Sequence, residues 1–147
     1  MINALKVSAI GAVDVMAIFL ENRYKGFQTL KKGTLRKIIS DMTKEGQIKT
    51  SHKQRYILTG LGVIRALPEI KKALTNDGKF RILVFDIPEK YRYKRDIFRR
   101  HIKLLGFQQH QQSVWVSQYD CEKWMQKIIN YHEVDNYVSL YIGEHVW

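Results

Sequence analysis

Basic and polar side chains between residues 31 and 55 have the types and spacing that contact with a nucleic acid requires. A helix fits the major groove of DNA, where exposed polar side chains reach base edges, while lysines and arginines beside it meet phosphates. The side chains expected to reach base edges are Arg36, Lys37, Ser40 and Lys44. The side chains expected to meet phosphates are Lys31, Lys32, Lys49, His52, Lys53 and Arg55.

One carboxylate offers a different chemistry. Asp86 ends the apolar run 80–85 and stands directly before Ile87 and Pro88. An aspartate in such a turn commonly accepts backbone hydrogen bonds. Two carboxylates brought together would instead hold Mg²⁺ and help to activate water. Since each chain carries a single acidic residue at this point, and Glu89 is not an obvious second ligand, the turn interpretation is favoured.

The other reactive residue types show no catalytic pattern. Cys121 is the single cysteine, which allows no internal disulfide and no cysteine cage for zinc, and suits a reducing compartment. We expect it to be a structural thiol. The histidines lack the spacing that puts two zinc ligands on one helix face. They are His52, His101, His110, His132 and His145.

Charge and hydropathy limit the class of protein. The chain has 147 residues, 45% of them hydrophobic, and 25 Lys and Arg against 14 Asp and Glu, a formal net charge of +11. Such a chain should be globular and attracted to polyanions. A bilayer span needs about 20 consecutive apolar residues. The best candidate, residues 9–20, is shorter and contains Asp14, and no signal-peptide cleavage site follows it. We expect a cytoplasmic protein.

A turn-forming stretch, Thr75-Asn76-Asp77-Gly78, separates two differently patterned halves. We place a domain boundary there, with one domain over residues 1–76 and another over residues 77–147. Residues 1–78 carry 14 Lys and Arg against 6 Asp and Glu, whereas residues 79–147 carry 11 against 8. The basic excess therefore belongs mainly to the first domain.

The first domain reads as helices followed by one hairpin. Thr34 is a candidate N-cap for the helix that Gly46 ends, Thr59 caps the last helix, and Pro68 should bend or divide that helix. The expected elements are helices over 5–20, 34–45 and 61–74, with a hairpin over 47–58. This order, with the stretch DMTKEGQIKT and then KQRYILTGLG, resembles the winged helix-turn-helix of many small bacterial regulators.

The second domain alternates strands and helices. The apolar run 80–85 suits a central strand, and a helical pattern follows until Gly106 ends it. The expected elements are strands over 80–85, within 107–117 and over 134–142, with helices over 91–105 and 121–131. If residues 107–117 form two strands, the order is β-α-β-β-α-β, which is ferredoxin-like and gives the whole chain an α+β fold.

The stretch KFRILVFDIPEKYRYKRDIFRRHIKLLGFQQHQQSVWVSQYDCE, residues 79–122, resembles the central domain of PaaX-type transcriptional repressors. That domain is in turn similar to the small CRISPR-associated nuclease-like protein that partners the spacer integrase. The resemblance implies a repressor that binds double-stranded DNA in a sequence-specific way as a homodimer, joined through the ferredoxin-like domain. In the CRISPR-associated relatives, the aspartate matched by Asp86 is paired across a homodimer and implicated in divalent-metal binding.

Two alternatives remain open at this point. One is a Mg²⁺-dependent endonuclease that uses Asp86, or an inactive DNA-clamping relative of the CRISPR adaptation type. The other is a protein-interaction module whose basic face only keeps it in solution. PaaX-type repressors carry a further C-terminal domain that does not follow before Trp147, so the acyl-coenzyme A binding of some members is not carried over. Any small-molecule effector is left open.

Overall fold

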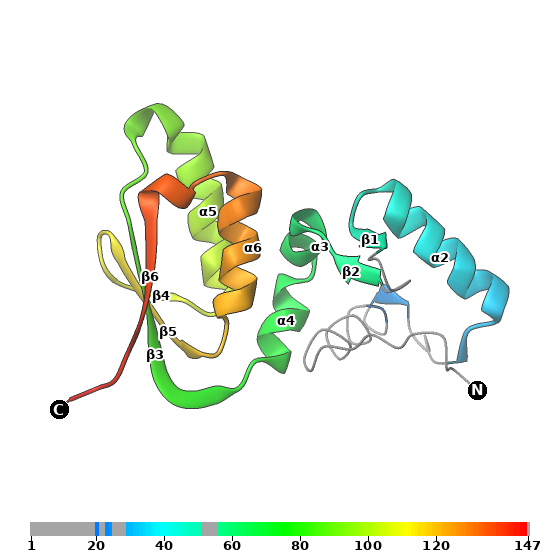
Figure 1. Ribbon diagram of the computed structural model, residues 1–147, viewed down its shortest axis with the longest axis horizontal. Coiled ribbons are helices and arrows are strands. Elements are labelled where there is room, and N and C mark those ends of the chain that lie inside the picture. Colours follow the sequence, from blue (N-terminus) through cyan, green and yellow to red (C-terminus); the bar gives the residue numbers. More distant parts are fainter. Residues whose placement is uncertain (1–19, 21–22, 25–28, 51–55, 147) are drawn as a thin grey trace. The chain divides into compact units, whose positions relative to one another are not determined.

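The computed structural model describes residues 20, 23–24, 29–50 and 56–146 (Figure 1). The chain divides into two compact units, unit 1 over residues 1–73 and unit 2 over residues 74–147. The expected helix over residues 5–20, apart from its last residue, and the tip of the expected hairpin at 51–55 lie outside the described residues.

Unit 1 contains a long helix, a two-stranded hairpin and two short helices. In the long helix, Ile38 and Met42 are buried one turn apart, as the apolar spacing predicts. In the antiparallel hairpin, Ile48 pairs with Leu58, and both side chains are buried. The elements within the described residues are α2 (Lys32–Lys44), β1 (Ile48–Thr50), β2 (Tyr56–Leu58), α3 (Gly60–Arg65) and α4 (Leu67–Ala73).

The ends of these helices follow the sequence with one exception. Thr59 caps α3, since its hydroxyl accepts a hydrogen bond from the Gly62 amide at 3.2 Å. Gly46, at a φ of 70°, follows α2 in the left-handed region. The expectation that Thr34 caps α2 is wrong. Lys31 has the extended N-cap backbone, with no side-chain hydrogen bond, so α2 starts before Thr34, which lies in its first turn.

Pro68 has the predicted effect on the last helix of unit 1. The helix is divided, with α3 ending at Arg65 and α4 beginning at Leu67. Because proline lacks a backbone N–H, it is tolerated in the first turn of a helix and not in its interior. The chain can therefore change direction between α3 and α4.

Gly62 is buried where α3 meets the segment that leaves α2. The amide of Thr59 donates to the carbonyl of Gln47 at 2.9 Å, which holds the two segments together. A Cβ atom on residue 62 would overlap that carbonyl oxygen and lie 2.9 Å from Cδ2 of Leu58. The contact therefore requires glycine.

Unit 2 has the predicted ferredoxin-like order. Its sheet has the strand order β4-β5-β3-β6 with every neighbouring pair antiparallel. Residues 107–117 contribute to two strands, as that fold requires. The elements are β3 (Asn76–Phe85), α5 (Arg92–Leu105), β4 (Gln108–Gln111), β5 (Val114–Tyr119), α6 (Glu122–His132) and β6 (Val138–Gly143), with short 3-10 helices η2 (Glu89–Tyr91) and η3 (Asp135–Tyr137).

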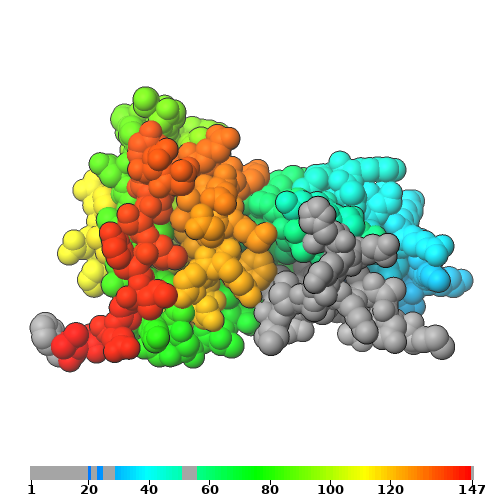
Figure 2. Space-filling model, in the orientation of Figure 1, coloured from blue at the N-terminus to red at the C-terminus, as the bar shows by residue number. Residues whose placement is uncertain are grey.

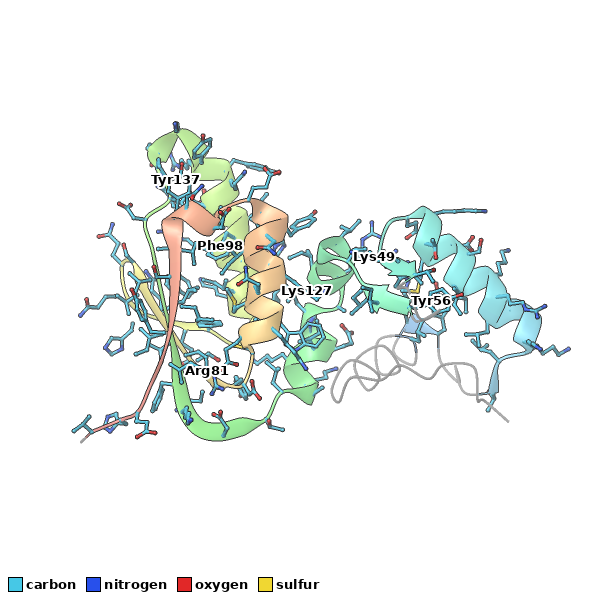
Figure 3. All side chains as sticks on the ribbon, in the orientation of Figure 1. Lys49, Tyr56, Arg81, Phe98, Lys127 and Tyr137 are labelled. Carbon is cyan, nitrogen blue, oxygen red and sulfur yellow. The ribbon has the colours of Figure 1, made fainter. Side chains whose placement is uncertain are left out.

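Helices α5 and α6 cover one face of this sheet (Figure 1). The core between the layers is aromatic, because the Phe85 ring meets Phe98 edge-on at 5.3 Å and stacks on Trp115 at 6.3 Å. Phe98, labelled in Figure 3, is fully buried on α5. β6 lies at the edge of the sheet, and Figure 2 shows it in red on the surface of unit 2.

The stretch expected to be a turn between the two halves belongs to β3. Asn76 pairs with Tyr119, and the register shifts between Asn76 and Arg81, which indicates a bulge. The turn chemistry is present inside the strand, since the Asn76 side chain accepts from the Gly78 amide at 2.8 Å and Gly78 has a φ of 80°. The expectation that this stretch forms a turn before the first strand is therefore wrong, because pairing with β5 extends β3 through it as a bulge.

We predict that Gly62→Ala destabilises unit 1 by about 1–3 kcal/mol, because an added methyl group in a packed contact forces the backbone apart. Thermal unfolding followed by circular dichroism measures the change. Gly33→Ala is the matched control. Residue 33 lies in α2 with open space around it, so an alanine there should leave stability unchanged or raise it by up to about 1 kcal/mol. A Gly62→Ala protein as stable as the wild type would contradict the close packing.

Candidate nucleic-acid interface

The outer face of α2 carries the side chains that the sequence assigns to base contacts. Arg36, Lys37, Ser40 and Lys44 are all exposed. Residues 36, 40 and 44 follow one another at four-residue spacing, so they share one side of the helix, opposite the buried Ile38 and Met42. The helix has no acidic residue in its first turn. It therefore presents a cationic and polar surface of the kind that fits a groove.

The side chains assigned to phosphates are only partly described. Lys31, Lys32 and Lys49 are exposed, at the start of α2 and on β1 (Lys49 is labelled in Figure 3). His52, Lys53 and Arg55 lie outside the described residues. The structure thus describes three of the six side chains assigned to phosphates, and they lie on α2 and β1, the two elements on either side of Gly46.

Backbone hydrogen bonds fix α2 relative to the hairpin and α3. The amide of Gln47 donates to Met42 at 2.9 Å, and the amide of Thr59 donates to Gln47 at 2.9 Å. An ion pair of 3.0 Å joins Arg65 of α3 to Glu45 at the end of α2. Both of its side chains are nearly half exposed, so the backbone bonds contribute more to this orientation.

Asp86 lies at the end of β3, as predicted, with its side chain exposed. Its amide donates to the carbonyl of Tyr137 at 3.0 Å. Within the described part of the chain, its carboxylate accepts no hydrogen bond and forms no ion pair. The expected turn, in which the carboxylate accepts backbone hydrogen bonds, is therefore not formed. The residue two positions on, Pro88, has no backbone N–H to donate.

The hollow beside Asp86 is mixed in charge. It has a volume of about 250 Å³ and is lined by Asp86, Glu89, Arg95, Arg99, Gln112 and Ser113 together with Phe85 and Ile87. Glu89 is engaged by Arg95 at 2.8 Å, and that hydrogen bond lowers the pKa of the Glu89 carboxyl. Over the described residues, no three His, Cys, Asp or Glu side chains gather in a way that could hold a metal ion.

A pair of histidines joins α5 to α6, and this pair was not predicted from the sequence. Nδ1 of His101 and Nε2 of His132 lie 2.8 Å apart, so one ring donates a hydrogen bond to the other. Burial, followed by the positive charge on His101 and Lys94, lowers the pKa of His132 to about 4. Burial also lowers the pKa of His101. No sequence signal marks the pair, because its members are 31 residues apart on different helices.

Cys121 is fully buried at the N-cap position of α6, in agreement with the expected structural thiol. Burial, reinforced by the negative charge of Glu122, raises the pKa of the thiol to about 12. The thiolate, which is the reactive form, is therefore scarce at neutral pH.

The sheet face of unit 2 that the helices leave open is apolar in its middle. Its middle row is Ile82, which pairs with Val116 on β5 and with Tyr141 on β6. Tyr141 is 58% exposed. Phe80, Val84 and Val114 extend the apolar surface, because they alternate with the buried Arg81, Leu83, Phe85 and Trp115. A hollow of about 480 Å³ lies on this face and is lined by Phe80, Ile82 and Val116 together with polar side chains, which include Gln108, Gln118 and His145.

The comparisons with known proteins concern unit 2. Residues 73–147 match the family model described as the PaaX protein central Cas2-like domain. The ferredoxin-like unit is therefore a Cas2-like domain, and the match extends over half of the chain. The chain belongs to the PaaX family, as its resemblance at residues 79–122 predicted. The searches of curated proteins and of solved structures found no match.

Among the residues that the structure describes, no helix has both the length and the apolar character to cross a bilayer.

The histidine pair predicts a loss of stability in mild acid. Between the folded pKa of His132, about 4, and the ordinary value of 6.5, the unfolded chain binds more protons than the folded one. The free energy of unfolding is therefore greatest above pH 6.5 and should fall by about 1–2 kcal/mol as the pH drops to 4. Urea unfolding followed by tryptophan fluorescence measures it, because all three tryptophans belong to unit 2.

His132→Gln should flatten this pH dependence, whatever its effect on absolute stability. His110→Gln is the control, because His110 is exposed on β4 and outside the pair. Equal pH dependence in the wild type and the His132→Gln protein would contradict the assignment.

Proposed function

We propose that this protein is a transcriptional regulator that binds double-stranded DNA in a sequence-specific way and acts as a repressor. Membership of the PaaX family carries the proposal, since residues 79–122 resemble the central domain of PaaX-type transcriptional repressors. The exposed cations of α2 support it, because a regulator of this kind needs a surface that enters a groove and meets phosphates. The formal net charge of +11 suits the same partner.

In this proposal, unit 1 is a winged helix-turn-helix. Helix α2 is the recognition helix, with Arg36, Lys37, Ser40 and Lys44 at base edges, and the hairpin of β1 and β2 is the wing. Lys31, Lys32 and Lys49 neutralise phosphates, together with His52, Lys53 and Arg55 of the wing tip. The described order of helix, antiparallel hairpin and capped helix is what such a module needs.

We further propose that the protein is a homodimer joined through the open sheet face of unit 2. An apolar sheet face that no helix covers is unfavourable in water, and a second copy of the same face would remove it from solvent. A two-fold pair presents two copies of α2, which suits an approximately palindromic operator whose half-sites are one helical turn or a multiple apart.

A Mg²⁺-dependent endonuclease, or an inactive DNA-clamping relative, is the second candidate. The observation that favours it is the exposed carboxylate of Asp86, which has no partner within the described residues. One carboxylate beside Arg95 and Arg99 is not a divalent-cation site within a single chain, so this alternative depends on a second copy. The DNA experiment below separates the two candidates.

We expect Arg36→Gln/Lys37→Gln to weaken binding to the operator about 10- to 100-fold and to weaken binding to random DNA much less, because base contacts carry the discrimination. Lys49→Gln should weaken both alike. The measurement is fluorescence anisotropy with labelled DNA from upstream of the gene and with random DNA, at two salt concentrations.

Lys71→Gln/Lys72→Gln is the matched control, because it removes two exposed charges from α4. An equal loss on operator and random DNA for the Arg36 and Lys37 variant, or the same loss for the control, would count against α2 as the recognition helix. Parallel samples with Mg²⁺ should leave the DNA intact. Cleavage that disappears in Asp86→Asn would establish the endonuclease instead.

The dimer should separate when charge is placed in the middle of the open sheet face. Ile82→Glu should weaken dimerisation by at least 100-fold, because an unpaired carboxylate would be buried on association. Light scattering after size-exclusion chromatography measures the mass over a range of concentrations. Gln126→Glu, which is exposed on α6, is the control and should stay dimeric. A wild-type protein that is monomeric at every concentration would rule out this interface.

A further inference from the structure

The positive charge of unit 2 is concentrated on α5. This helix carries six Lys and Arg against one Asp, whereas the rest of residues 74–147 carries five against eight. A helix face with many charges is often only solvated. The partners of these six side chains therefore decide whether the charge is available to a ligand.

Two of the six side chains are used within unit 2. Lys94 pairs with Glu133 at 3.4 Å, which joins α5 to the end of α6. Arg95 donates to the carbonyl of Ile87 at 3.2 Å and pairs with Glu89 at 2.8 Å. Both side chains lie toward the core side of the helix, so they fasten α5 to its surroundings.

The other four side chains form a row along one side of the helix, which we name the α5 ridge: Arg92, Arg99, Arg100 and Lys103. Arg99, Arg100 and Lys103 follow Arg92 by seven, eight and eleven residues, so all four lie on the same side of the helix. The row is about 17 Å long. Arg92, Arg100 and Lys103 are exposed, and the Arg99 side chain is one-third exposed.

Ion pairs neutralise little of the α5 ridge. Arg92 and Glu89 are 3.9 Å apart, with more than two-thirds of each side chain exposed, and Arg99 and Asp96 are 3.8 Å apart. Pairs this long and exposed contribute little. Within the described residues, no carboxylate lies within 4.0 Å of the charged groups of Arg100 or Lys103.

Aromatic rings support two members of the α5 ridge. The guanidinium of Arg99 lies 5.8 Å from the centre of the Phe85 ring, and Nζ of Lys103 lies 5.6 Å from that of Trp115. Both rings belong to buried residues of the sheet, so these contacts restrict the side chains. The strand β4, which follows α5 in the chain, is exposed throughout and has no acidic residue.

From this geometry we propose that the α5 ridge is a second DNA contact that binds the phosphate backbone without regard to sequence. The inference rests on the proposed function and adds a site on the Cas2-like domain. A DNA strand presents one phosphate per 3.4 Å of helix axis, so a ridge of about 17 Å faces several of them. An acidic protein partner is less well matched, since charged residues are depleted at the core of protein interfaces, whereas all four residues of the row are charged.

The test removes two ridge charges in the full chain. Arg100→Gln/Lys103→Gln should lower affinity for operator and random DNA by the same factor, about tenfold at 0.1 M salt. The plot of log affinity against log salt concentration should become less steep by about 2, because two fewer phosphates are neutralised. The ratio of the two affinities should not change.

Lys79→Gln/Lys123→Gln is the control, with the same change in charge. Lys123 lies over Trp124 at 5.0 Å, as Lys103 lies over Trp115, and Lys79 is exposed like Arg100. The control should keep the wild-type slope. An unchanged slope in the ridge variant, or an equal change in the control, overturns the inference while the α2 variants still test the proposed function. A wild-type protein that binds no DNA overturns both.

Discussion

A buried guanidinium organises the Cas2-like domain. Arg81 is 2% exposed on the helix side of β3 (labelled in Figure 3). It pairs with Asp77 in the bulge of its own strand and with Glu122 at 2.8 Å in the first turn of α6. The hydrogen bond from Arg81 holds the pKa of Asp77 well below its usual range. Removing one partner of a buried ion pair commonly costs about 3–5 kcal/mol. One side chain thus ties the irregular start of the central strand to the helix that covers it.

The sequence predicted those features of the fold that depend on residues close together in the chain. Thr59, Gly46 and Pro68 act on their own turn of the chain. The apolar run 80–85, the alternation within 134–142 and the helical patterns between them indicated the β-α-β-β-α-β order, on the condition that residues 107–117 form two strands. The same local reasoning could not show that Asn76 would pair with Tyr119, since their bond depends on a strand more than 40 residues away. It also took residues 80–85 for a simple apolar strand, although Arg81 stands inside it and needs three acidic neighbours to be buried.

The same distinction between local and long-range features applies to the candidate site. Exposure on α2 follows from helical spacing, so Arg36, Lys37, Ser40 and Lys44 could be assigned to an outer face in advance. The contact of His101 with His132 and the absence of a carboxylate beside Arg100 depend on which elements meet in space. Neither α5 nor α6 alone carries a pattern that predicts them. The sequence therefore predicts which side of a helix a residue lies on. Whether a charged side chain is free to bind a ligand depends on the side chains that tertiary structure brings beside it.

The strand order of the Cas2-like domain has a consequence for how the protein folds during synthesis. β3 is the first strand of this sheet in the chain, and it pairs with β6, the last. Phe85 therefore gains its β6 partner, Val138, only after the rest of the domain has been synthesised. Only β4 and β5 are neighbours in both the chain and the sheet. Long-range pairing of this kind slows folding, because the entropy cost of closing a long loop must be met before the contacts between its ends can stabilise the fold. Until residue 143 leaves the ribosome, one edge of β3 stays unpaired, which exposes it to chaperones and to other nascent chains.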